Sequence, residues 1–310
     1  MDWFRALTGL PSDDPVTVRA GTLVEGEWLV LPSGRRLRAG RLTLPALGEI
    51  PVPPPGSVRF REVVADVRDL HADPANAGAV FLVASQFNLL EMRGPEVLPE
   101  DGIARYAHDR TQGPVCAMAC AAGTIWRNYL VPLEGLRGQN AWVQIDTMAD
   151  IGRALGPGLW DMKNGYLLPH PGALERIAQA IRGREAALRD LLRVGVQADT
   201  EVTLPGAGHV VTQIYASALP VAYGEGPAPA WEPFARLVLE AAYEATFRLA
   251  APVGRVFLTR LGGGAFGNAA AWITEAILAA ARRSPADLEV VMVSYGSPDP
   301  ANRALIEALS

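Results

Sequence analysis

The chain has 310 residues, of which 49% are hydrophobic and 20% charged, enough for one large domain or two small ones with a sizeable core. The formal net charge is −5 and no long run of like charge occurs, so no basic surface for nucleic acid is predicted. No apolar run reaches the length of a membrane span, and the first residues lack the pattern of a signal peptide. We therefore expect a cytoplasmic protein with no membrane partner.

The cysteine and histidine content argues against a metal centre. The only two cysteines, Cys116 and Cys120, stand four residues apart in an apolar segment, and we expect both to be small buried side chains. A structural zinc site needs four ligands, and no second pair of Cys or His lies nearby in sequence. The four histidines show no metal-ligand spacing. The sequence thus predicts no metal and no cofactor.

The N-terminal part has the pattern of a small β-rich module. Between residues 17 and 47, short apolar runs alternate with turn residues at hairpin spacing. The segment PVPPPGS, Pro51–Ser57, is a stiff spacer and marks a boundary. Whether the module covers a sheet edge, binds a partner or pairs two chains is left open. The predicted organisation is a module over 1–50, a linker over about 51–57 and an α/β domain over 58–310.

The run Val80–Ala84 is apolar throughout, which predicts a central strand buried on both faces. Polar residues follow its end directly, including Gln86, Asn88 and Glu91. Asp66 ends the preceding strand-like run. Ligands of open α/β sheets bind at the carboxyl ends of the strands, so these residues are candidates for a binding site.

A dense polar stretch precedes a segment rich in small residues, Pro114–Ile125, which we expect to form a buried helix or another tightly packed segment. One interpretation is a loop that lines a site, and the other is a solvated connection with ion pairs. The stretch contains Glu100, Asp101, Arg105, Tyr106, Asp109, Arg110, Thr111 and Gln112.

The second half of the chain alternates helices and strands. This β-α-β-α-β order is typical of a wound α/β sheet. The predicted elements are a helix near 146–155, a long amphipathic helix over 171–193, strands over 194–204 and 209–219, a helix from Pro233, a strand over 256–261, a helix over 269–283 and a strand over 288–295.

A glycine loop, Leu261–Asn268 (LGGGAFGN), joins the predicted strand and helix near the carboxyl end. Glycines let the backbone approach a ligand, and their amides can point at an anion beside a helix N-terminus. We interpret the loop as a phosphate cradle; a tight turn that needs glycine only for geometry is the alternative. No Lys-Ser or Lys-Thr follows the glycines, which excludes a Walker loop, and the late position argues against a Rossmann dehydrogenase.

Two places in the chain resemble the macrodomain superfamily, the ADP-ribose-binding fold that includes the poly(ADP-ribose) glycohydrolases. The layout VVADVRDL followed by VFLVASQFNLL places Asp66 and Asn88 at matching positions, and LGGGAFGN resembles the Gly-x-Gly-x-Phe-Gly loop. The resemblance implies a three-layer α/β/α fold with a mixed sheet and spans roughly Val58–Tyr295. It also extends to uncharacterised proteins that share the N-terminal module.

The resemblance also implies residue roles. Asp66 would accept a hydrogen bond from the adenine amino group, and Asn88 would contact the distal ribose. The family's glycine loop after the first Asn and the Gly-Gly-Gly…Gln-Glu-Glu signature of the glycohydrolases are both absent here. Asn268 is a further candidate for ligand binding. The residues that would wrap the diphosphate are Gly262, Gly263, Gly264, Ala265, Phe266 and Gly267.

Cleavage of an ADP-ribosyl bond passes through an oxocarbenium-like state and needs a proton donor for the leaving group. We predict Glu91 and Asp101 as the catalytic carboxylates, because Glu91 follows a strand end and Asp101 precedes Gly102, which permits close approach. Surface or ion-paired roles are the alternative for each. Gln86 and Gln112 would orient a water or hold ribose hydroxyls, and a structural role is the alternative for each.

The sequence therefore favours a hydrolase that acts on an ADP-ribosyl linkage, with ADP-ribose or an ADP-ribosylated target as its partner. A non-catalytic ADP-ribose reader and a purely structural α/β protein are the alternatives. No oligomeric state is predicted.

Overall fold

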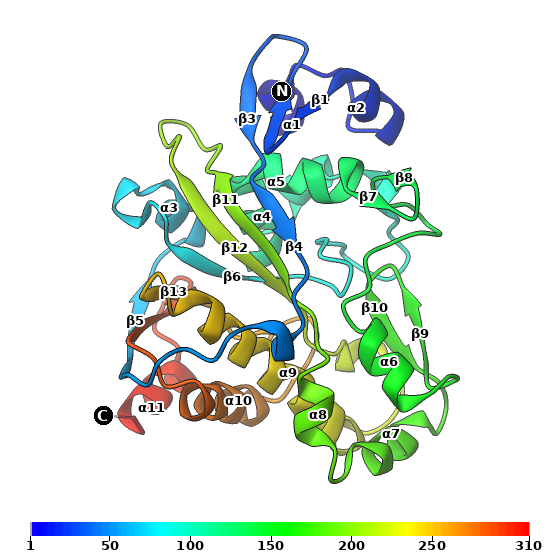
Figure 1. Ribbon diagram of the computed structural model, residues 1–310, viewed down its shortest axis with the longest axis vertical. Helices are drawn as coiled ribbons and strands as arrows, with labels where there is room; N and C mark the ends of the chain where they lie inside the picture. Colours follow the sequence, from blue (N-terminus) through cyan, green and yellow to red (C-terminus); the bar gives the residue numbers. More distant parts are fainter. Residues whose placement is uncertain (1, 310) are drawn as a thin grey trace.

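The computed structural model describes residues 2–309 and is built around a seven-stranded mixed sheet (Figure 1). Five neighbouring strands run parallel, whereas β11 is antiparallel to both of its neighbours. The predicted α/β class with a mixed sheet is thereby confirmed. In spatial order the strands are β4 (Arg41–Thr43), β11 (Gly195–Glu201), β12 (Val210–Ala216), β6 (Val80–Ala84), β13 (Arg255–Leu258), β14 (Leu288–Ser294) and β5 (Val58–Val64).

Helices cover both faces of the sheet (Figure 1). Successive residues of β6 point to opposite faces, so Val80 and Leu82 belong to one core while Phe81 and Val83 belong to the other. The first core is covered by α6 (Ala149–Leu155), α7 (Ala173–Ile181), α8 (Glu185–Arg189), α9 (Ala228–Ala250), α10 (Ala270–Arg283) and α11 (Pro300–Glu307). The second lies under α3 (Val67–Ala72) and α4 (Gln112–Ala119). The layers are therefore α/β/α, as expected.

The N-terminal region forms α1 (Trp3–Thr8), α2 (Pro15–Gly21) and a small antiparallel sheet of β1 (Leu23–Glu25), β2 (Trp28–Val30) and β3 (Arg36–Arg38). Its apolar side chains share a core with residues of 103–130, including α5 (Ala121–Ile125). The next strand, β4, already belongs to the main sheet, where it pairs with β11. Two short hairpins complete the strands: β7 (Pro132–Leu133) with β8 (Leu136–Arg137), and β9 (Trp160–Lys163) with β10 (Tyr166–Pro169).

Several element boundaries differ from those predicted. The helix expected over Pro171–Arg193 is two helices, because Gly183 adopts a left-handed conformation (φ 72°) between α7 and α8. Helix α9 begins at Ala228, before Pro233, and β13 ends at Leu258 rather than Leu261. Glycine takes up the left-handed conformation at residue 183 without strain, which accounts for the break after α7.

His71 of α3 is fully buried and neutral in the second core. Its Nδ1 lies 2.7 Å from the carbonyl oxygen of Val67, its Nε2 lies 3.0 Å from Nε2 of Gln213, and its ring stacks on Phe81 with centroids 3.8 Å apart. Burial lowers the pKa of His71 from 6.5 to about 4, against the opposing hydrogen bond to Val67. The uncharged ring thus fits the site, and a proton would disrupt it.

The acid sensitivity of the fold should therefore depend on His71. Because its folded pKa is depressed, the stability it contributes is present above pH 6.5 and is lost as pH falls towards 4. The loss should reach on the order of 3 kcal/mol near that lower value. In urea unfolding at a series of pH values, His71→Gln should flatten this part of the stability curve; an unchanged slope would contradict the assignment.

Candidate active site

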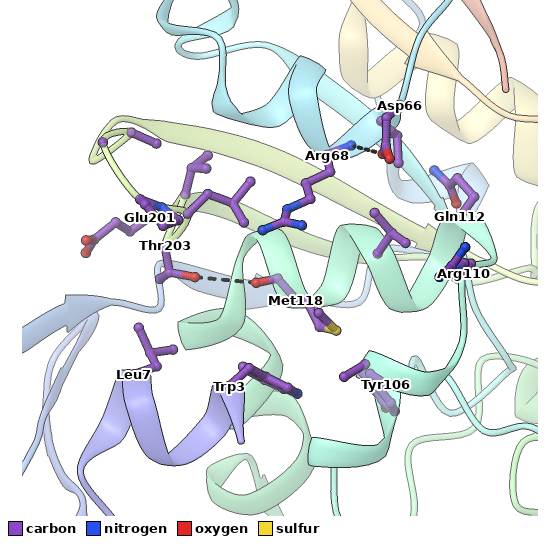
Figure 2. A pocket seen from close by; sticks show the side chains of 18 of the residues that line it. Trp3, Leu7, Asp66, Arg68, Tyr106, Arg110, Gln112, Met118, Glu201 and Thr203 are labelled. Atoms are coloured by element: carbon purple, nitrogen blue, oxygen red, sulfur yellow. Dashed lines mark hydrogen bonds between the residues drawn. The ribbon is translucent and has the colours of Figure 1, made fainter. Parts of the chain in front are cut away.

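A cavity of about 1170 Å³ opens at the carboxyl ends of the parallel strands (Figure 2). Asp66 follows β5, Thr259 follows β13 and Tyr295 follows β14, and all three line it. Gln112, at the start of α4, lies at the same end of the cavity, while Trp3 and Leu7 of α1 lie at its opposite end. The residues at the carboxyl ends lie where α/β proteins bind ligands. The cavity also extends to the hairpin between β11 and β12, residues 201–208, at the amino ends of the parallel strands.

Asp66 lies at the cavity with part of its carboxylate committed. Its Oδ1 accepts a hydrogen bond from the backbone amide of Arg68 at 2.8 Å, which caps α3. Its Oδ2 accepts none from any residue within 2–309. One oxygen therefore remains for a donor on a ligand, as the predicted contact with an adenine amino group requires.

The glycine loop is fixed at its ends and open in its middle. Gly262 and Gly267 are left-handed (φ 70° each), and the side-chain amide of Asn268 donates to the carbonyl of Leu219 at 2.8 Å. Gly263, Gly264, Ala265 and Gly267 are exposed. Across residues 2–309, no acceptor is bonded to the amides of Gly264, Ala265 and Phe266.

Helix α10, which follows the loop, has no side-chain cap at its N-terminus. The backbone donors that an anion needs are therefore present. The loop itself does not line the large cavity, but Thr259 shortly before it does.

Phe266, the aromatic residue of the loop, packs on two tyrosines. Its ring centroid lies 5.3 Å from that of Tyr166 and 5.7 Å from that of Tyr223. Tyr166 is buried and its hydroxyl donates to the carbonyl of Met92 at 2.7 Å, next to Glu91. These contacts connect the glycine loop to the segment after β6. Tyr166 and Tyr223 lacked any motif in the sequence that could have singled them out.

Gln86 and Asn88 make internal hydrogen bonds. The amide of Gln86 bonds both backbone groups of Met92, accepting at 2.6 Å and donating at 3.2 Å. Asn88 is fully buried, donates to Gln144 Oε1 at 2.8 Å and accepts from the amide of Leu90. Both side chains hold the loop after β6 in shape, and neither lines the cavity.

Gln112 completes the ladder of β6. Its Oε1 accepts from the amide of Ala84 at 2.9 Å, and its Nε2 donates to the carbonyl of Leu82 at 2.8 Å. Strand β13 pairs with β6 only as far as Phe81, so the Gln112 amide takes the place of a neighbouring strand. The side chain still borders the cavity.

Glu91 is 4% exposed, and its Oε1 has no hydrogen-bond partner among residues 2–309. A side chain at Gly113 would collide with Oε2 of Glu91, so the carboxyl group lies against the first turn of α4. Burial raises the pKa of Glu91 well above its usual value; Arg127 opposes this and Asp109 adds to it. Such a carboxyl is protonated where an ordinary glutamate is charged, as a general acid requires.

Asp101 occupies a different environment. It is exposed, its Oδ2 accepts from the backbone amide of Leu98 at 3.0 Å, and it lies 3.7 Å from Arg105. The close neighbour of Gly102 is the carboxylate of Asp13. Asp101 caps a short turn and, like Glu91, is not among the residues that line the cavity.

Arg127 was missed as a site residue, although it interrupts an apolar run. It is fully buried, its guanidinium lies 3.6 Å from the ring centroid of Tyr215, and its Nε donates to the carbonyl of Leu89 at 3.2 Å. A buried cation near Glu91 can stabilise the carboxylate that remains after proton donation. Within 2–309, no group of three His, Cys, Asp or Glu side chains is placed to hold a metal ion.

Comparison by sequence finds no matching protein family and no matching curated protein. Solved structures do match. They include poly(ADP-ribose) glycohydrolase from Deinococcus radiodurans in complex with ADP-ribose (13% identity, 97% of this chain and 98% of that chain, TM-score 0.43). The glycohydrolase from Thermomonospora curvata also matches (13% identity, 94% and 95%, TM-score 0.41). In the described chain, no helix has the length and apolar character to cross a membrane.

The protonation of Glu91 should be visible in stability. Its pKa is raised above 4.5 in the folded state, so its contribution is full below that pH and falls as pH rises through the folded pKa. Glu91→Gln removes this pH-dependent loss of stability, because glutamine does not ionise. The free energy of unfolding of the variant should therefore rise relative to that of the wild type, by roughly 1.4 kcal/mol for each unit of pH up to the folded pKa. Urea unfolding measures this, and parallel stability curves would refute it.

Proposed function

We propose that this protein binds ADP-ribose and hydrolyses a glycosidic bond at its distal ribose, with Glu91 as the proton donor. The observation that carries the proposal is the buried, unpaired carboxyl of Glu91 beside α4. Asp66 and the glycine loop follow strands that end at the same edge of the sheet. The combination offers an acceptor for adenine, amides for a diphosphate and an acid for a leaving group.

In the proposed complex, Oδ2 of Asp66 accepts from the adenine amino group. The amides of Gly264, Ala265 and Phe266 donate to the pyrophosphate, helped by the positive end of α10. Phe266 and Tyr223 lie against the distal ribose, which directs its C1″ bond towards Glu91. The internally bonded amides of Gln86, Asn88 and Gln112 shape this surface without donating to the ligand.

The reaction needs one proton transfer in each direction. Neutral Glu91 donates its proton to the leaving atom as the bond from C1″ to that atom breaks, giving an oxocarbenium-like ribose. The positive charge of Arg127 stabilises the Glu91 carboxylate that remains. A water attacks C1″ and loses its proton to Asp109, which lines the cavity, and transfer through solvent restores the Glu91 acid. Asp101, as an exposed cap, has no step in this scheme.

The two predicted catalytic carboxylates can be separated by matched amide variants. Glu91→Gln should lower kcat on an ADP-ribosylated substrate by at least about a hundredfold, since it removes the acid. Asp101→Asn should keep kcat within about twofold, because an Asn side chain still caps a turn. Calorimetry should give both variants the wild-type Kd for ADP-ribose. A comparable loss in Asp101→Asn would restore the pairing predicted from sequence.

A protein that binds ADP-ribose but shows no turnover of any linkage would be a reader rather than a hydrolase. A protein that gives no heat with ADP-ribose would be neither. The same two measurements on the wild type therefore distinguish all three functions considered.

The adenine contact has its own test. Asp66→Ser keeps a side chain that caps α3 but withdraws the second oxygen. Its Kd for ADP-ribose should rise by about tenfold, the effect of one hydrogen bond to a charged group. The analogue of ADP-ribose that carries hypoxanthine in place of adenine lacks the amino group, so its Kd should be equal for the wild type and Asp66→Ser. An equal loss for both ligands would argue against a contact between Asp66 and the base.

A further inference from the structure

Residues 102–106 connect the N-terminal region to Glu91. We propose that α1 and the loop before α2 position the Glu91 carboxyl by clamping this segment, with Tyr106 as the residue that transmits the contact. The inference rests on the proposed function, in which Glu91 is the acid. It gives the N-terminal region a role in the reaction itself.

The clamp holds both backbone groups of Ala104. The indole Nε1 of Trp3 donates to its carbonyl at 2.9 Å, and Oδ2 of Asp13 accepts from its amide at 2.7 Å. Gly102, with a positive φ of 85°, lies so close to the Asp13 carboxylate that a side chain there would collide with it. The segment is thereby fixed from the N-terminal side.

Tyr106 extends from the clamped segment into the interior. Its ring is 1% exposed and belongs to the core formed with Phe4, Leu10 and other N-terminal side chains. Its hydroxyl accepts a hydrogen bond from the backbone amide of Glu91 at 2.9 Å. Figure 2 shows Trp3 and Tyr106 on the same side of α4. An unbroken series of contacts therefore runs from α1 to Glu91.

The position of Glu91 depends on this contact because the carboxyl has no hydrogen bond of its own to fix it. Its Oε1 is unpartnered within the described chain, while Gln86 and Asn88 hold the backbone of the neighbouring residues Met92 and Leu90. The bond to Tyr106 is the one that holds the backbone amide of Glu91 itself. A small displacement would change its distance to the buried Arg127 and to Asp109. The other titratable groups that sense Glu91 are Tyr106, Cys116 of α4, Tyr166 of β10 and Tyr215 of β12.

Two variants test the series at different points. Tyr106→Phe keeps the packed ring but removes the acceptor for the Glu91 amide. Asp13→Ala releases the amide of Ala104, and Asp14→Ala is its matched control, because Asp14 caps α2 through Thr17 without contacting Ala104. Tyr106→Phe and Asp13→Ala should each lower kcat by about tenfold with unchanged Kd for ADP-ribose, and the kcat of Asp14→Ala should stay within about twofold of the wild-type value.

The double variant of Tyr106→Phe and Asp13→Ala should lower kcat no more than the stronger single variant does, since both residues act through the same series of contacts.

A readout independent of turnover is the infrared carbonyl band of the protonated Glu91, identified by its absence in Glu91→Gln. Its titration midpoint, and that of the pH profile of kcat, should shift in Tyr106→Phe and Asp13→Ala but not in Asp14→Ala. Unshifted midpoints in both test variants would overturn the inference while leaving the proposed hydrolase intact. A wild type without turnover would refute the hydrolase, and the infrared band would still decide whether the clamp positions Glu91.

Discussion

The candidate site depends on the way in which β6 ends. Its ladder with β13 stops at Phe81, and the Gln112 amide bonds Ala84 and Leu82 in place of a strand. Unpaired backbone groups at this buried position would be costly. The same two hydrogen bonds attach the N-terminus of α4 to β6, which brings Gly113 against Glu91. A requirement of the sheet thus accounts for the position of α4 beside the Glu91 carboxyl.

The sequence predicted the features that depend on local pattern. Three such features are the apolar run of β6, the polar residues at its end and the glycine loop before α10. Each could be recognised because strand burial and backbone conformation restrict which residue types occur at a position. The mixed sheet between two helical layers followed from the resemblance that these motifs carry. The end of α7 was not predicted, because a glycine inside a helical pattern weakens a helix without determining whether it ends there.

The partners of polar side chains could not be predicted in the same way. A glutamine or asparagine at a strand end can contact a ligand or close a loop, and Gln86, Asn88 and Gln112 all bond to protein here. Asp101 and Glu91 were equivalent in sequence, yet one is exposed and the other buried. The difference arises from Tyr106, Gly113 and Arg127, which approach Glu91 from separate elements, and a single sequence does not encode such proximity in any local pattern.

The contact between Trp3 and Ala104 spans 101 residues of sequence. On the ribosome, α1 leaves the exit tunnel long before its partners between 103 and 130 are synthesised. The nascent chain therefore carries Trp3, Phe4 and Leu7 without the surface that later buries them. Such long-range pairings close late, so the N-terminal region can reach its final place only after residues 103–130 have been synthesised, and until then its apolar helix is exposed surface of the kind that chaperones bind.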